Sequence, residues 1–250
     1  MRTVILSGDS IHKGDLILVN RSCACPADST GTMIPISDGK PPVLLHRAAA
    51  ALLIELIKHI HAQGSIVPVS GWRSVTEQKE IWEVSVAENG VDFTKKYVAV
   101  PGHSEHQTGL AVDLGLKGPD LDFIRPAFPY TGICQTFREE APNYGFVERY
   151  PQGKEFVTGI GHECWHFRYV GIPHAAVMTE KKLTLEEYLL FLRKYPHGQR
   201  AYRYENRGFC ADISFCPAEQ TGTTRLNIHT DKPCAISGNN MDGYIITEWR

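Results

Sequence analysis

The sequence predicts an α+β fold, in which helices flank a small antiparallel sheet and a C-terminal antiparallel β appendage follows. Apolar residues recur at three- and four-residue steps over 43–63, which is typical of an amphipathic helix. Aromatic and polar residues alternate over 163–169, and short alternating runs separated by turn residues fill the chain after 197, which is typical of strands. We therefore expect two domains, over residues 1–196 and 197–250.

The first elements follow from runs of apolar residues. Residues 15–20 include a continuous apolar run, which predicts a strand. A loop rich in proline and glycine separates it from the helix over 43–63. Gly64 ends that helix, because glycine readily adopts the left-handed conformation of a helix cap.

The next strand and helix have sharper boundaries. Residues 66–70 predict a strand that leads into the sequence GWR. Ser74 and Glu77 then form a capping box, in which each side chain satisfies a backbone N–H of the first helical turn. The helix that starts there is expected to run to about residue 88.

Glycine and proline are frequent from 89 to 130, so we expect mostly loops there, and loops often carry function. Later elements are shorter: a strand over 110–114, a helix over 135–141, strands over 145–150 and 164–170, and helices over 173–181 and 185–195.

The appendage is expected to be an antiparallel sheet. Its strands are predicted over 201–205, 211–216, 225–228 and 244–249, and Asp242 with Gly243 forms a hairpin turn.

Composition excludes several classes of protein. The chain has 250 residues, of which 42% are hydrophobic and 22% charged, enough to bury a core. Lys plus Arg number 26 against 28 Asp plus Glu, and this balance argues against a nucleic-acid partner. Uncharged apolar segments stay well below the ~18 residues of a membrane span.

The chain is expected to stay in the cytoplasm. If Met1 is the native start, the apolar run after it is too short for a secretory signal. The 7 cysteines are odd in number and irregularly spaced, so we expect free thiols. Oligomeric state is left open.

A first candidate site lies at His106 and Asp113. Gly109 and Ala111 between them are small, so on a strand the Asp113 carboxylate would project above small neighbours and leave room for a metal ion. Imidazole and carboxylate ligands together suit zinc. A strand-end aspartate beside a histidine also occurs in ordinary structure, so this pair alone leaves both readings open.

A second candidate site lies in residues 163–169. The aromatic positions there define a core face, and His166 points away from it, which also fits an ordinary polar-face histidine. Together with Glu163, His106 and Asp113 it completes a set of two histidines, one carboxylate and a further glutamate. Catalytic zinc sites have this composition: three protein ligands, an open position for water and a general base.

These motifs resemble those of the zinc D,D-peptidases of the VanY and VanX type, which share their metal fold with lysostaphin-like enzymes and hedgehog domains. The pattern SxHxxGxAxD at 104–113 is followed about fifty residues later by ExWH at 163–166. Residues 70–74 read SGWRS and are similar to the family's SGYRS. Cys164 stands where the family usually has proline. The resemblance covers most of residues 15–195. Because no secretory signal or membrane span is predicted, the chain resembles the soluble bifunctional VanXY type within this group.

The resemblance implies a role for each motif residue. His106, Asp113 and His166 would bind one zinc ion per chain. Glu163 would activate a water molecule as general base and later protonate the leaving amine.

The resemblance also implies three residues that act on the substrate. Arg73 would stabilise the oxyanion or hold the scissile carbonyl, and Gln78 and Ser104 would meet the C-terminal carboxylate or amides of the substrate. Each has a structural alternative: a surface arginine at a helix start, a glutamine on a helix face and a capping serine.

The implied reaction is zinc-dependent hydrolysis of the D-Ala-D-Ala bond. The substrate would be the free dipeptide, the pentapeptide precursor of peptidoglycan or the finished wall stem, and a cytoplasmic location favours the first two. Family analogy adds a contribution to glycopeptide (vancomycin) resistance.

Two alternatives stay open. One is an L,D-carboxypeptidase or a phage-type cell-wall endopeptidase on the same scaffold. The other is a non-catalytic zinc-binding module, against which Glu163 and Arg73 argue, because a structural zinc site needs neither.

Overall fold

The chain folds into two units in the computed structural model, which describes residues 1–27, 31–119, 121–206, 209–220, 222–229 and 232–250. The central unit spans Val19–Thr184, and the terminal unit combines Met1–Leu18 with Leu185–Arg250. This division differs from the expected 1–196 and 197–250, because strand β1 (Arg2–Ser7) pairs with β10 (Thr223–Ile228) near the other end of the chain.

The central unit is built on a four-stranded antiparallel sheet with the strand order β4-β5-β7-β6. Its strands are β4 (Ile66–Ser70), β5 (Ala111–Leu116), β6 (Phe146–Tyr150) and β7 (Glu163–Tyr169). The predicted strands at these four places are confirmed, with β4 at the predicted bounds.

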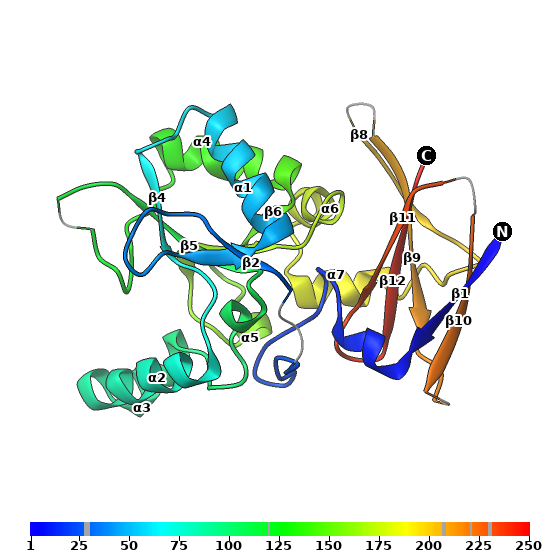
Figure 1. Cartoon of the computed structure of the whole chain (residues 1–250), viewed down its shortest axis with the longest axis horizontal. Helices are drawn as coiled ribbons and strands as arrows, with labels where there is room; N and C mark the ends of the chain where they lie inside the picture. The colour runs from blue at the N-terminus through cyan, green and yellow to red at the C-terminus, as the bar shows by residue number, and fades with distance from the viewer. Residues whose placement is uncertain (28–30, 120, 207–208, 221, 230–231) are drawn as a thin grey trace. The chain divides into compact units, whose positions relative to one another are not determined.

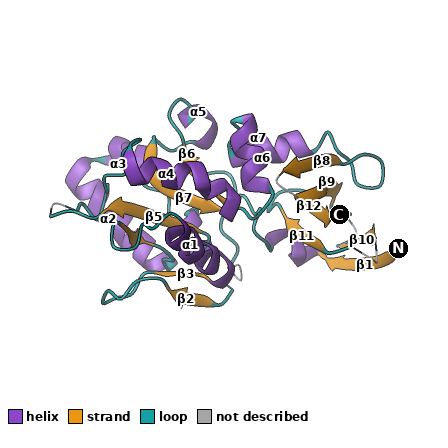
Figure 2. Cartoon of the chain, turned by 90° about the horizontal axis from the view of Figure 1, so that it is seen from above, coloured by secondary structure: helices purple, strands orange, loops and turns teal. Residues whose placement is uncertain are grey.

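Helices α1 (Arg47–His59) and α4 (Gly132–Glu140) lie on one face of this sheet (Figures 1 and 2). The main hydrophobic core lies between them and the sheet, and it contains Leu53 and Leu56 of α1, Phe137 of α4 and Phe167 of β7. Because strand side chains alternate between faces, the residues next to Phe167 point to the opposite face.

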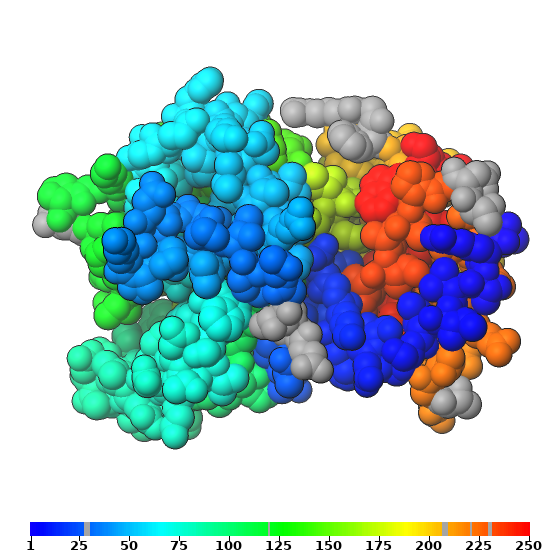
Figure 3. Space-filling view, viewed as in Figure 1, coloured from blue at the N-terminus to red at the C-terminus, as the bar shows by residue number. Residues whose placement is uncertain are grey.

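Helices α2 (Val75–Asn89) and α3 (Val91–Tyr97) follow β4 and pack against each other. Their residues form one continuous part of the surface of the central unit, turquoise in Figure 3. The predicted capping box of α2 is confirmed: the Glu77 backbone N–H donates to Ser74 Oγ at 3.1 Å, and the Ser74 N–H donates to Glu77 Oε2 at 2.7 Å.

The remaining elements of the central unit are short. They are β2 (Met33–Pro35), β3 (Leu44–His46), the 3-10 helices η2 (Glu105–Thr108) and η3 (Ala141–Tyr144), and helices α5 (Glu155–Thr158) and α6 (His174–Lys181).

The terminal unit contains a sheet with the strand order β11-β12-β9-β8 and the separate pair β1-β10. Tyr244 and Ile246 of β12 form its core with Leu226 and Ile228 of β10. Its other elements are η1 (Gly8–His12), α7 (Leu185–Leu192), β8 (Tyr202–Asn206), β9 (Phe209–Pro217), β11 (Cys234–Gly238) and β12 (Gly243–Trp249).

Several expectations were wrong in detail. Residues 15–20 form no strand: Leu16 to Val19 are buried, but only Asn20 makes an isolated bridge, so their apolar character reports burial and not strand pairing. Strands β1, β2 and β11 and helices α3 and α5 were not expected, and β3 occupies the start of the helix predicted over 43–63, which spans Arg47–His59.

Two expectations from composition can be compared with the structure. The structure records no disulfide bond among the seven cysteines. The longest described helix, α2, has 15 residues, and within the described ranges no helix reaches the length and hydropathy that crossing a membrane requires.

Candidate active site

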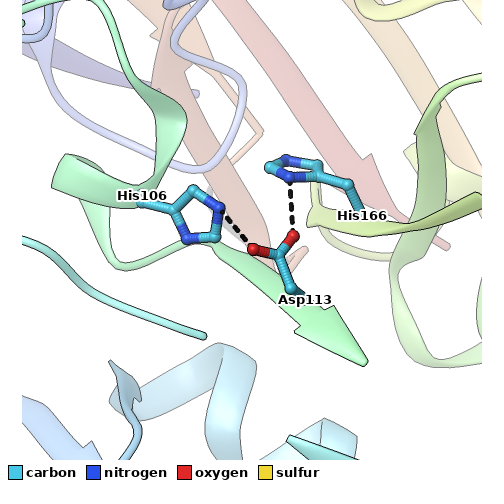
Figure 4. A group of neighbouring side chains, drawn as sticks. All are labelled: His106, Asp113 and His166. Atoms are coloured by element: carbon cyan, nitrogen blue, oxygen red, sulfur yellow. Dashed lines mark ion pairs between the residues drawn. The ribbon is translucent and has the colours of Figure 1, made fainter. Parts of the chain in front are cut away.

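The candidate site is assembled by the middle of the central sheet. Asp113 on β5 and His166 on β7 are directly opposite each other in the antiparallel register, on the face away from the main core. The 3-10 helix η2 precedes β5 and brings His106 to the same place. All three side chains come together, as Figure 4 shows.

The turn between η2 and β5 explains the glycine of the motif. Gly109 is left-handed, with φ of 71°, and a Cβ there would lie 2.5 Å from the Met33 sulfur. Gln107 fixes the other end of η2, since its Oε1 accepts the backbone N–H of Gly102 at 3.0 Å. The spacing between His106 and the strand therefore depends on a glycine.

The three side chains present two nitrogens and a carboxylate. Asp113 Oδ2 lies 3.2 Å from His106 Nε2, and Asp113 Oδ1 lies 3.0 Å from His166 Nδ1. Candidate ligand atoms from the three residues all lie within 4.8 Å of one another.

The hydrogen bonds around this group fit a divalent metal ion. His106 Nδ1 lies 2.7 Å from the Gly71 carbonyl oxygen; a carbonyl only accepts, so Nδ1 carries the proton and Nε2 keeps its lone pair. Asp113 Oδ1 is buried and makes no hydrogen bond within the described part of the chain. A cation between these donors would satisfy them.

Burial and neighbouring charge set the protonation of the group. Burial lowers the pKa of His106 to about 4, and the charge of Arg73 adds to this, so the ring is neutral as a metal ligand must be.

Glu163 and Arg73 lie beside the three candidate ligands in one cavity of about 310 Å³. Glu163 Oε2 is 3.7 Å from His166 Nδ1. Burial raises the pKa of Glu163 to about 8; Asp113 adds to this rise, whereas His166 and Arg73 oppose it. A buried carboxylate with a raised pKa can both take and return a proton near neutral pH.

The match to known proteins agrees with this geometry. The model of the VanY family, D-alanyl-D-alanine carboxypeptidase, matches residues 42–172. The chain belongs to the VanY family. The predicted resemblance is confirmed at the level of the family.

Relatives of this VanY-family chain include the VanXYC protein of Enterococcus gallinarum, named as a bifunctional D-Ala-D-Ala dipeptidase and carboxypeptidase. It is 45% identical over 157 residues, covering 62% of this chain and 82% of the relative.

Solved structures extend the match. The vancomycin resistance D,D-dipeptidase VanXYg, in complex with a D-Ala-D-Ala phosphinate analogue, has a TM-score of 0.96 and 46% identity over 100% of this chain and 99% of its own. The LD-carboxypeptidase LdcB has a TM-score of 0.59 and 35% identity over 69% of this chain and 84% of its own. The predicted α+β class is confirmed by these matches.

Other residues predicted from the family motifs also line the cavity. Ser104 is 2% exposed and Gln78 is 1% exposed. The Gln78 side-chain N–H donates to the Ala99 carbonyl at 2.8 Å, while its Oε1 is buried and has no hydrogen-bond partner within the described ranges. Gln78 therefore keeps one acceptor without a described partner at the wall of the cavity.

Sequence reasoning missed the buried charges beneath this VanY-family site. Glu105 on η2 pairs with Arg149 of β6 and Arg168 of β7, and all three side chains are inaccessible to solvent. A buried pair of this kind needs residues from three separate elements, so local spacing gives no signal for it. Tyr150 and Trp165, which line the cavity, were also not assigned to the site.

Gly71 is expected to be intolerant of any side chain. A Cβ at this position would lie 2.2 Å from the Leu44 carbonyl oxygen, and the Gly71 carbonyl accepts from His106. We expect Gly71→Ala to lower the free energy of unfolding by about 1–3 kcal/mol and to weaken metal binding.

Urea unfolding of the metal-free protein measures the effect of Gly71→Ala. Gly118→Ala is the matched control, since a Cβ there meets no atom within 4 Å. Equal stability of the two variants would contradict the prediction.

Proposed function

We propose that this protein is a zinc-dependent D,D-peptidase that hydrolyses the D-Ala-D-Ala bond in the free dipeptide and at the C-terminus of peptidoglycan pentapeptide precursors. One observation carries the proposal: the candidate ligands His106, Asp113 and His166 share a single cavity with Glu163 and Arg73. We propose that the enzyme contributes to vancomycin resistance by removing the D-Ala-D-Ala ends of peptidoglycan precursors.

The three candidate ligands would hold one zinc ion per chain. When bound, zinc supplies Lewis acidity that makes water more acidic and polarises a carbonyl group. His106 and His166 contribute nitrogen and Asp113 contributes oxygen, a donor set that zinc accepts.

Glu163 would move the proton that the reaction requires. Its carboxylate takes a proton from the attacking water as the water oxygen bonds to the carbonyl carbon of the peptide. When the C–N bond breaks, Glu163 returns the proton to the leaving amine, and free D-alanine departs. The other product is the shortened peptide when the substrate is the pentapeptide, or a second D-alanine when the substrate is the dipeptide.

Arg73 would stabilise the negative charge that grows on the carbonyl oxygen. Its side chain lines the cavity, and its Nε is buried with no hydrogen-bond partner among the described residues. Because this donor is already held in place, little free energy is needed to reorient it as the charge develops during the reaction.

Arg73→Lys is expected to lower kcat by about 10²–10³-fold with metal content unchanged, because a lysine ammonium does not reproduce the fixed fork of a guanidinium. Single-turnover kinetics and metal analysis of the same sample measure both quantities. A variant with wild-type kcat would place Arg73 outside the reaction.

Gln78 and Ser104 would position the substrate. One of the two side-chain N–H groups of Gln78 is bonded to Ala99, and its Oε1, which has no partner among the described residues, would accept a substrate N–H. Ser104 offers a hydroxyl at the start of η2.

The test is release of D-alanine from free D-Ala-D-Ala and, in parallel, from the UDP-linked muramyl pentapeptide, with a chelator control. Chelator-sensitive release from both substrates supports the proposal. Release from one substrate alone would reduce it to a dipeptidase or a carboxypeptidase, and metal-independent release would contradict it.

The likeness to LdcB makes an L,D-carboxypeptidase the second candidate. Stem peptides ending in an L,D bond separate the two, because an L,D enzyme cleaves them and leaves D-Ala-D-Ala intact. Internal cross-linked peptides test the endopeptidase alternative in the same assay.

The proposed location is the cytoplasm, where the pentapeptide precursor is made. The odd number and irregular spacing of the seven cysteines support it, since regular disulfide frameworks are typical of oxidising compartments.

A further inference from the structure

Glu105 directs its two carboxylate oxygens at different partners. Oε1 accepts from Arg149 Nε and from Arg168 Nη1, each at 2.8 Å. Oε2 lies 3.7 Å from His166 Nε2. Both Oε2 and Nε2 are buried and make no hydrogen bond to any residue that the structure describes.

The imidazole ring of His166 therefore lies between two carboxylates. Its Nδ1 faces Asp113 Oδ1 at 3.0 Å, on the side of the candidate metal ligands, and its Nε2 faces Glu105. A neutral imidazole carries one proton, so a ring that offers Nδ1 to a metal must carry that proton on Nε2.

We propose that Glu105 is a positioning residue for the metal centre: its Oε2 holds the proton on His166 Nε2, so that the Nδ1 lone pair faces the metal. This inference rests on the proposed function through the assignment of His166 as a ligand. A carboxylate behind a ligating histidine fixes the tautomer and the ring orientation, and makes the ring a stronger ligand.

The two arginines make this arrangement specific. Both donate to Oε1 from side chains that are themselves fully buried, which leaves Oε2 to face His166. They also fix its orientation, because Arg149 and Arg168 can only donate and must face an oxygen.

Glu105→Gln tests the inference because the arginines dictate how the amide must lie. The amide oxygen has to face the arginines, so the amide N–H₂ faces His166 Nε2. His166 Nε2 must then accept a hydrogen bond, which favours a proton on Nδ1, the nitrogen that the metal needs.

The measurement is zinc affinity by competition with a fluorescent chelator, with no substrate present. We expect Glu105→Gln to bind zinc about 10–100-fold more weakly than the wild type. The visible absorption spectrum of the cobalt(II)-loaded protein is expected to change as well, since it reports the geometry of the ligands.

A matched control separates positioning from loss of stability. Leu53→Ala removes a buried side chain from α1, in the core on the opposite face of the sheet. It is expected to destabilise the fold while leaving zinc affinity and the cobalt spectrum unchanged. Equal losses of affinity in Glu105→Gln and Leu53→Ala would overturn the inference.

Glu105→Asp covers the case in which Glu105→Gln does not fold. It keeps the negative charge for the two arginines but is one methylene shorter, so it cannot reach them and His166 together. We expect a smaller loss of zinc affinity in the same direction, and wild-type affinity would overturn the inference.

The two proposals fail in different ways. A wild-type protein that binds zinc tightly but releases no D-alanine would refute the proposed function and leave the role of Glu105 intact. Wild-type zinc affinity in a folded Glu105→Gln protein would refute the role of Glu105 and leave the proposed function intact.

Discussion

Glu163→Gln is expected to lower kcat for D-alanine release by about 10²–10⁴-fold, with one metal ion still bound per chain. Glutamine has nearly the same shape as glutamate but cannot take a proton from water. Glu163 is 8% exposed and borders the cavity, so the substitution changes its chemistry with little change in packing. Substrate binding should be nearly unchanged.

Single-turnover release of D-alanine and metal analysis of the same sample test the role of Glu163. Glu155→Gln removes the same charge from α5, which carries no residue of the cavity, and should behave like the wild type. A Glu163→Gln protein that keeps more than a tenth of wild-type kcat would contradict the role of Glu163 as the proton carrier. If the Glu163→Gln protein lost its metal ion, Glu163 would instead be a metal ligand.

His166→Ala is expected to lose both the metal and the activity. His166 is 3% exposed and its Nδ1 faces the Asp113 carboxylate, so alanine removes one of the two nitrogen donors from the group. With two candidate ligands left, zinc should dissociate during dialysis, and D-alanine release should fall to the level of the chelator-treated wild type.

His59→Ala is the control for His166→Ala. His59 lies on α1 with an exposed side chain, and its loss should leave metal content and turnover unchanged. If His166→Ala kept a full equivalent of zinc, the ligand set would have to be drawn from other residues. Added zinc is not expected to restore the variant at concentrations that saturate the wild type.

The elements that could be predicted from the sequence are those with local signals. The capping box of Ser74 and Glu77 marked the start of α2, and the apolar run of β4 was bounded by turn residues. Strand β1 contains a short apolar run, but its pairing with β10, more than two hundred residues away, has no local signal. Burial of Leu16 to Val19 was evident, but hydrophobicity alone does not reveal whether a strand has a partner.

The candidate site could be predicted to a similar degree. Motif spacing brought His106, Asp113, His166 and Glu163 to attention, and the structure places all four in one cavity. The positions behind them could not be predicted, since the contact of Glu105 with two arginines depends on which strands are neighbours in the sheet. Arginines in a strand are indistinguishable from surface charges until the sheet is assembled.

The pairing of β1 with β10 has a consequence for how the protein is made. Every strand of the central sheet lies between Ile66 and Tyr169, and the central unit ends at Thr184, so that unit can fold once residues 19–184 have left the ribosome. The terminal unit folds later, because β1 is synthesised more than two hundred residues before its partner β10. Folding in the cell is therefore expected to proceed from the central unit outward, with residues 2–7 unpaired until β10 has been synthesised.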